Sequence, residues 1–139
     1  MATTTSATTY IENIENILSR EEYIAACKSN EVSNYRDRVI DEILLSLGPS
    51  LFEVVRQNLV RNLETDFQEL VNATPVEIEI LERDDIIYDG LTFTTYTLAE
   101  QMEGVRKERF NLTFQKLKKN LKERLRWAQR SQELTRAHL

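Results

Sequence analysis

The chain has 139 residues, of which 18 are Lys or Arg and 23 are Asp or Glu, so its formal net charge is -5. This length favours one domain with a core of its own and excludes two independent enzymes. Hydrophobic residues make up 41% and charged residues 29%, which excludes wholesale disorder. The sequence contains no apolar run near the roughly 20 residues that span a bilayer, and no secretory signal pattern. Cys27 has no second cysteine to pair with, so we expect a cytoplasmic protein.

The mild total charge conceals a sharp division near Gly104. Residues 1–104 carry 7 basic and 20 acidic side chains, a net charge of -13. Residues 105–139 carry 11 basic and 3 acidic side chains, a net charge of +8. The sequence therefore joins an acidic body to a basic C-terminal segment, and the total charge says little about partners.

The N-terminal part predicts a leader followed by short helices. Residues 1–9 are rich in threonine and show no periodicity, which is typical of a disordered leader. Isoleucine and leucine at helical spacing predict an amphipathic helix over 10–18. Ser19 is followed three residues later by Glu22, a capping-box pattern that predicts the start of another helix.

Two longer helices are predicted next. Apolar residues at helical spacing predict a helix over 32–47 that ends at Gly48-Pro49, since glycine ends helices and proline cannot continue them. Ser50 is a suitable cap for the following helix. That helix should end before Pro75, because proline disfavours a helical residue immediately ahead of it.

The apolar period changes from 3.6 to 2 after Pro75. Apolar side chains alternate with glutamates over 76–80, and residues 91–97 are dominated by Thr, Phe and Tyr, which suit a pleated surface. Asp89-Gly90 is a typical turn pair, so a β-hairpin is predicted over about 76–97. A turn at Arg83-Asp84-Asp85 would instead add a third short strand.

The segment from Leu98 to about Arg136 predicts one long helix. Its Lys, Arg, Glu, Gln and Leu residues favour a helix, and only Gly104 opposes one. The helix would extend for roughly 50 Å, too far to be covered by so small a domain. Four apolar residues at 4-3-4 spacing form a partial coiled-coil pattern through which the chain would self-associate: Phe110, Phe114, Leu117 and Leu121.

These elements predict the fold class α+β, mostly helical, as one domain. The disordered leader covers 1–9, the acidic body with helices packed on the hairpin covers 10–97, and the basic helix covers 98–139. The helix leaves the body in this interpretation.

Residues that carry catalytic chemistry are scarce. His138 is next to the end of the sequence, where helices fray, and Cys27 lies on an apolar helix side. The isolated glycines exclude a phosphate loop, and the counts of Cys and His exclude a zinc site. Acidic residues between Glu77 and Asp89 lack the spacing of a calcium loop. We therefore predict no enzyme, no cofactor, no metal and no small-molecule substrate.

The basic segment is the one feature that predicts a function. Its cations surround the helix, with a tryptophan among them: Arg106, Lys107, Arg109, Lys116, Lys118, Lys119, Lys122, Arg124, Arg126, Trp127 and Arg130. The positive charge would dock on the protein's own acidic body or on an acidic partner protein, or it would neutralise nucleic-acid phosphates. A membrane surface is disfavoured because aromatic and basic faces are not separated. The favoured hypothesis is a non-enzymatic adaptor or regulatory accessory protein, and the alternative is a nucleic-acid-binding accessory protein.

The middle of the chain resembles a known family. The resemblance rests on Val55-Arg56-Gln57-Asn58-Leu59, Gln68-Glu69-Leu70-Val71, Pro75-Val76 and residues 92–98. These match the V-R-x-x-L helix, the E-L-[IV] helix end and the strand pair in the C-terminal half of a small bacterial family, which is accessory to a sodium-translocating, membrane-potential-generating system. The resemblance covers residues 51–98, roughly a third of the chain. It implies an α+β subdomain and a soluble accessory role, and it supplies no catalytic residue.

Overall fold

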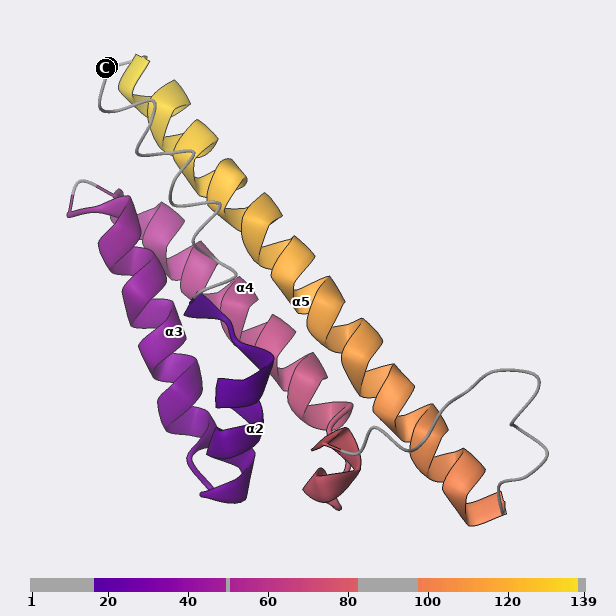
Figure 1. Cartoon of the computed structure of the whole chain (residues 1–139). Helices are drawn as coiled ribbons and strands as arrows, with labels where there is room; N and C mark the ends of the chain where they lie inside the picture. Colours follow the sequence, from indigo (N-terminus) through magenta and orange to yellow (C-terminus); the bar gives the residue numbers. More distant parts are fainter. Residues whose placement is uncertain (1–16, 50, 83–97, 138–139) are drawn as a thin grey trace.

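All regular structure in the described part of the chain is helical. The computed structural model describes residues 17–49, 51–82 and 98–137. Its elements are α2 (Arg20–Lys28), α3 (Val32–Leu47), α4 (Glu53–Asn72), the 3-10 helix η1 (Ile78–Glu82) and α5 (Leu98–Ala137). Successive α-helices run in alternating directions and form an up-and-down bundle (Figure 1). Among these helices, not one combines the length and the apolar composition that crossing a membrane requires.

The predicted β-hairpin is wrong where the structure describes it. Residues Ile78–Glu82 form a 3-10 helix at the place of the first strand. Ile80 and Leu81 are both buried, at 2% exposure each. Neighbouring residues of a strand point to opposite faces, whereas a tight helical turn directs both toward the bundle. The α+β class is therefore replaced by an all-helical one, and residues 83–97 lie outside the described residues.

Several predicted helix ends are confirmed. Gly48 follows α3 with φ of 85°, in the left-handed region that glycine adopts without strain. Ser19 caps α2, because its Oγ accepts the backbone N–H of Glu22 at 3.4 Å. The start of α4 differs from the prediction: Phe52 stands at the cap position and makes no side-chain cap. Outside the described residues lie the predicted leader at 1–9, residues 10–16 of the first predicted helix, Ser50 and His138.

An aromatic cluster joins the four α-helices at the centre of the bundle. The ring of Tyr23 on α2 stacks on Phe110 of α5 at 5.7 Å between centroids and meets Tyr35 of α3 edge-on at 6.1 Å. Tyr35 in turn meets Phe67 of α4 at 6.4 Å. Both phenol groups have hydrogen-bond partners, since Tyr23 bonds the Thr74 hydroxyl at 2.8 Å and Tyr35 donates to the Ser19 carbonyl at 3.2 Å. Burial raises the pKa of Tyr35 to about 12.

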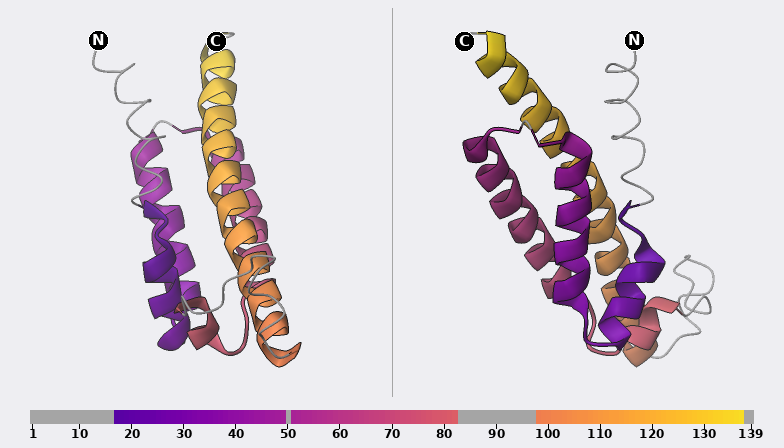
Figure 2. Two further views of the ribbon diagram at one scale, coloured as in Figure 1. Left: turned by 45° about the vertical axis from the view of Figure 1, so that its right-hand side comes forward. Right: turned by 90° about the vertical axis from the view of Figure 1, so that its left-hand side faces the viewer.

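The long helix α5 packs mainly against α4. Its buried residues extend the predicted apolar spacing by almost two turns beyond Leu121. Each of them is no more than 2% exposed: Phe110, Phe114, Leu117, Leu121, Leu125 and Ala128. On α4 the facing positions include Leu59, Leu63 and Leu70, which are fully buried. Figure 2 shows α5 lying along α4 and continuing past the α3–α4 connection. At 40 residues, α5 is about 60 Å long.

Arg20 of α2 links η1 to α5. Its Nη2 donates to the carbonyl of Leu81 in η1 at 2.7 Å, and its Nε donates to the Asn111 side chain of α5 at 3.1 Å. The guanidinium also lies 5.7 Å from the centroid of the Phe110 ring. One side chain of α2 therefore holds η1 and α5 in register.

Burial of the α5 seam makes a stability prediction. Leu117→Ala removes a side chain that is 2% exposed, and we expect it to lower the free energy of unfolding by about 2–5 kcal/mol. Leu45→Ala on α3 makes the same chemical change at 79% exposure and should cost less than about 0.5 kcal/mol. Urea unfolding followed by circular dichroism measures both. Equal losses in the two variants would contradict the assignment of Leu117 to the core.

Candidate functional site

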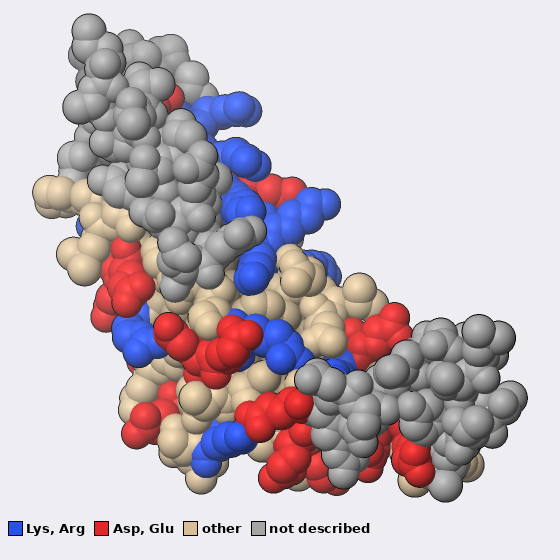
Figure 3. Space-filling model, viewed as in Figure 1, with Lys and Arg blue, Asp and Glu red and all other residues tan. Residues whose placement is uncertain are grey.

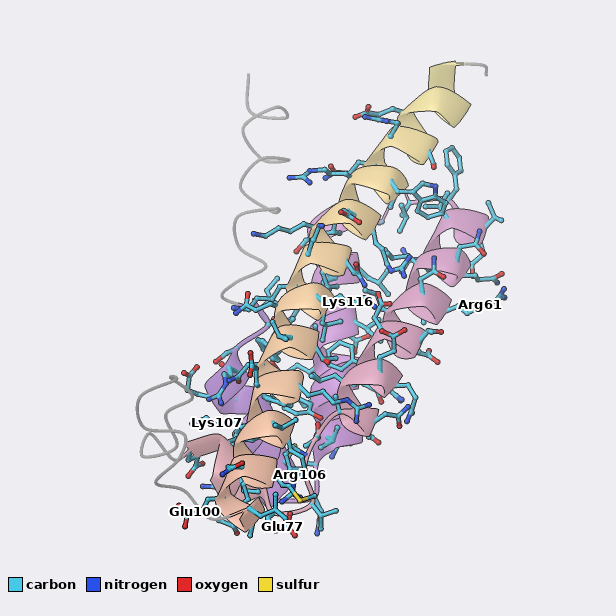
Figure 4. The ribbon with its side chains drawn as sticks, turned by 90° about the vertical axis from the view of Figure 1, so that its right-hand side faces the viewer. Arg61, Glu77, Glu100, Arg106, Lys107 and Lys116 are labelled. Carbon is cyan, nitrogen blue, oxygen red and sulfur yellow. The ribbon has the colours of Figure 1, made fainter. Side chains whose placement is uncertain are left out.

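Three cations of α5 are paired with carboxylates of the protein's own body. Arg106 donates to Glu77 at 2.7 Å, beside η1, and Lys116 lies 3.5 Å from Glu69 of α4. Figure 4 shows Arg106 next to Glu77 at the lower end of α5 and Lys116 on the side that faces α4. The hydrogen bond from Arg106 lowers the pKa of Glu77. These contacts show that part of the basic segment docks on the acidic body, as one interpretation of the sequence predicted.

The third pair, between Arg124 and Asp66, is the most buried. Arg124 Nε donates to Asp66 Oδ2 at 2.6 Å and Nη2 donates to Oδ1 at 3.1 Å, a two-pronged arrangement that matches the planar guanidinium to the carboxylate. Asp66 is the one buried charged residue in the described part of the chain, at 5% exposure. This hydrogen bonding raises the pKa of Arg124. The pair ties the C-terminal half of α4 to the distal half of α5.

Other predicted cations lie on the flank of α5. Lys118 is half-buried and its Nζ lies 5.3 Å from the centroid of the Phe114 ring. Lys107 and Lys122 are also half-buried and make interactions of their own. Arg109 is exposed in the proximal half of the helix. The structure therefore divides the predicted set of cations rather than gathering it at one site.

Three cations point outward from the distal half of α5. Lys119, Arg126 and Arg130 are exposed and lie seven and four residues apart, so they share one side of the helix. No carboxylate in the described ranges lies within ion-pair distance of these three side chains. Figure 3 shows Lys and Arg gathered along this part of α5, with Asp and Glu concentrated toward the lower end. We call these three residues the basic face.

Trp127 lines a separate cleft between α4 and α5. The side chain is 42% exposed, and the cleft, of about 470 Å³, is also lined by Asn62, Asn120, Glu123 and Arg124. Its one carboxylate and two amides are not a metal-binding set, and no group of metal-ligating residues occurs among the residues that the structure describes. Trp127 turns away from the basic face, because it lies one residue beyond Arg126 on the helix.

Cys27 is not arranged as a nucleophile. The thiol is half-buried, and burial raises its pKa above the ordinary value, which keeps it protonated at neutral pH. Among the described residues, the thiol contacts the side chain of Tyr23. Tyr23 is a weak acid, and burial raises its pKa as well. A reactive cysteine needs a cation or a helix N-terminus beside it.

The four residues predicted to drive self-association lie inside the protein. Phe110, Phe114, Leu117 and Leu121 are 0–2% exposed and belong to the core cluster. Their spacing reported a contact within the chain, with α4 and α2, and they offer no surface to a second molecule. Sequence reasoning also missed Asp66, although its position between Leu63 and Phe67 on the apolar side of α4 marks it as buried.

Comparison with known proteins identifies no relative. The chain matches no protein-family model, no curated protein and no solved structure. The family resemblance of residues 51–98 therefore stays a prediction.

The Asp66–Arg124 pair makes a second stability prediction. Asp66→Asn keeps the shape but leaves a partly buried guanidinium without its counter-charge, so we expect a loss of roughly 2–3 kcal/mol in unfolding free energy. Arg124→Gln in the same background should cost little more, because the two residues act as a unit.

The exposed pair of Glu69 and Lys116 serves as the control for these variants. Glu69→Gln should change stability by less than about 1 kcal/mol, since Glu69 and Lys116 are half or more exposed in their side chains. Additive losses for Asp66 and Arg124 would show that the buried pair is not coupled.

Proposed function

We propose that the protein is a non-enzymatic adaptor or regulatory accessory protein that binds an acidic partner protein through the basic face of α5. The observation that carries the proposal is the sorting of charge along the helix. Cations that face the bundle are paired with its own carboxylates, whereas Lys119, Arg126 and Arg130 face outward without a described counter-charge.

The shape of the basic face supports a helical or extended acidic partner. Three cations over twelve residues of a straight helix span about 17 Å, which suits carboxylates spaced along another rod-like segment. The exposed side chains keep their hydration until a partner arrives, so such a contact would be reversible and sensitive to salt.

Nucleic acid is the second candidate, and the same three cations favour it. Two features weigh against this candidate. Glu123 lies between Lys119 and Arg126 and is exposed, and the rest of the protein is acidic, so a long polyanion that extends past the basic face would meet repulsion. A protein partner with a limited acidic surface avoids this repulsion.

A charge-neutralised variant tests the proposal. Lys119→Gln, Arg126→Gln and Arg130→Gln together remove the basic face while leaving the core and the body-facing pairs unchanged. Purified full chain is used to capture partners after nuclease treatment, and each captured protein is then purified and titrated against the variants. We expect an acidic protein whose affinity for the variant falls tenfold or more, on the order of 1–3 kcal/mol for three charges at low salt.

A matched control separates position from net charge. Lys28→Gln, Arg38→Gln and Arg61→Gln remove one lysine and two arginines that are exposed on α2, α3 and α4. Figure 4 shows Arg61 on the side of α4 away from α5. This control should bind the acidic partner as the natural chain does. Equal losses in both variants would contradict the basic face, and a salt-sensitive shift of mixed DNA and RNA fragments, lost only in the first variant, would favour nucleic acid.

A further inference from the structure

The cleft between α4 and α5 gathers hydrogen-bonding groups that the fold leaves unused. Its volume is about 470 Å³, which lies within the range of small-molecule sites. Asn62 of α4 and Asn120 of α5 line it and are half-buried, and neither amide has a hydrogen-bond partner among the residues that the structure describes. The indole N–H of Trp127 likewise has no partner in the described ranges. These groups are therefore available to a ligand.

The two amides lie on either side of the buried ion pair. Arg124 of α5 meets Asp66 of α4, and the two helices run antiparallel (Figure 1). Asn62 stands one turn before Asp66, which sets it nearly level with Trp127. Asn120 stands one turn before Arg124, on the opposite side of the pair. The positions of the two asparagines are thus about 12 Å apart along the helices, so a ligand that uses both must be elongated.

The charge of the cleft disfavours an anionic ligand. Arg124 donates through Nε and Nη2 to Asp66, so its positive charge is neutralised within the protein. Glu123 is exposed and makes no ion pair in the part of the chain that the structure describes. Among the residues that line the cleft, no other cation offsets this carboxylate. A phosphate group would meet repulsion here, whereas an uncharged ligand would not.

We propose that the cleft binds an uncharged adenine nucleoside. The base stacks on the indole of Trp127, since aromatic side chains are the usual platform for planar bases. The amide of Asn62 carries a donor and an acceptor side by side, and these match N7 and the N6 amino group of adenine. Asn62 Nδ2 donates to N7, and the N6 amino group donates to Asn62 Oδ1.

The ribose occupies the other half of the cleft. Its hydroxyls both donate and accept, so they suit the amide of Asn120 and the carboxylate of Glu123. Acidic side chains accept ribose hydroxyls in dinucleotide-binding folds as well. A free base would reach only one of the two amides, whereas a nucleoside reaches both. No residue of the basic face lines the cleft, so this binding does not depend on the proposed function.

Fluorescence of the full chain during titration with adenosine is the first test. Trp127 is the one tryptophan of the sequence, so its emission reports directly on the cleft. We expect saturable quenching, because the base stacks on the indole. Emission that shows no saturable change up to about 1 mM adenosine overturns the proposal.

Variants of the cleft identify the contacts. By calorimetry, Trp127→Ala and Asn62→Ala should each raise the dissociation constant for adenosine tenfold or more. Asn34→Ala is the matched control, since Asn34 is exposed on α3 and receives the same change as Asn62. Circular dichroism checks that each variant remains folded. Equal weakening by Asn34→Ala and Asn62→Ala would contradict the site.

A change of ligand tests how the base is recognised and leaves the protein untouched. Inosine has a carbonyl where adenosine has the N6 amino group, so Asn62 Oδ1 loses its donor and meets a second acceptor. We expect inosine to bind at least tenfold more weakly than adenosine. Equal affinities would show that the asparagine does not recognise the adenine edge, and they would overturn the assignment.

Adenosine monophosphate represents the phosphate-bearing sources of adenine, which are nucleotides and RNA. We expect it to bind no more tightly than adenosine, and Glu123→Gln should strengthen its binding relative to that of adenosine. Tenfold tighter binding of the monophosphate by the natural chain would show a phosphate site instead. The variant with Lys119, Arg126 and Arg130 changed to glutamine should still bind adenosine, which separates the cleft from the basic face.

Discussion

The contact between α4 and α5 is the interaction on which the rest of the structure depends. It combines an apolar seam, which includes Leu63 of α4 and Leu117 of α5, with one buried polar contact, the two-pronged ion pair of Asp66 and Arg124. Apolar side chains alone would allow the helices to slide by a turn, because leucine against leucine is tolerant of register. A buried carboxylate must meet its guanidinium, so the ion pair fixes one register. This register determines where each residue of α5 lies relative to α4.

Much of the bundle could be predicted from local signals in the sequence. Helical periodicity located the four α-helices, and Gly48 and Ser19 marked their ends, because caps and breakers act within a few residues. The β-hairpin could not be predicted correctly, since alternation over 76–80 is also compatible with a short helical turn. What distinguishes the 3-10 helix from a strand is that Ile80 and Leu81 are both buried, against helices distant in the sequence. Tertiary contacts overrode the local pattern at this point.

The candidate site was predictable in composition but not in arrangement. The sequence located the cations on one helix, yet it could not tell which of them face α4. That requires the partner carboxylates, which lie more than forty residues away for Lys116 and Arg124. The apolar spacing of Phe110 and Phe114 likewise did not reveal whether the covering helix belongs to the same chain or to another. Apolar periodicity indicates that one face of a helix is buried, while only the fold shows which element covers that face.

The length of α5 turns the division of charge into an electric dipole. Acidic side chains gather at the end of the bundle that holds α2 and η1, while the basic face lies toward the other end of the helix (Figure 3). Opposite charges held apart by a rigid rod experience a torque in the field of any charged surface. The molecule would therefore rotate into alignment with a charged partner before contact, and this steering would fade within a Debye length of about 8 Å at physiological salt.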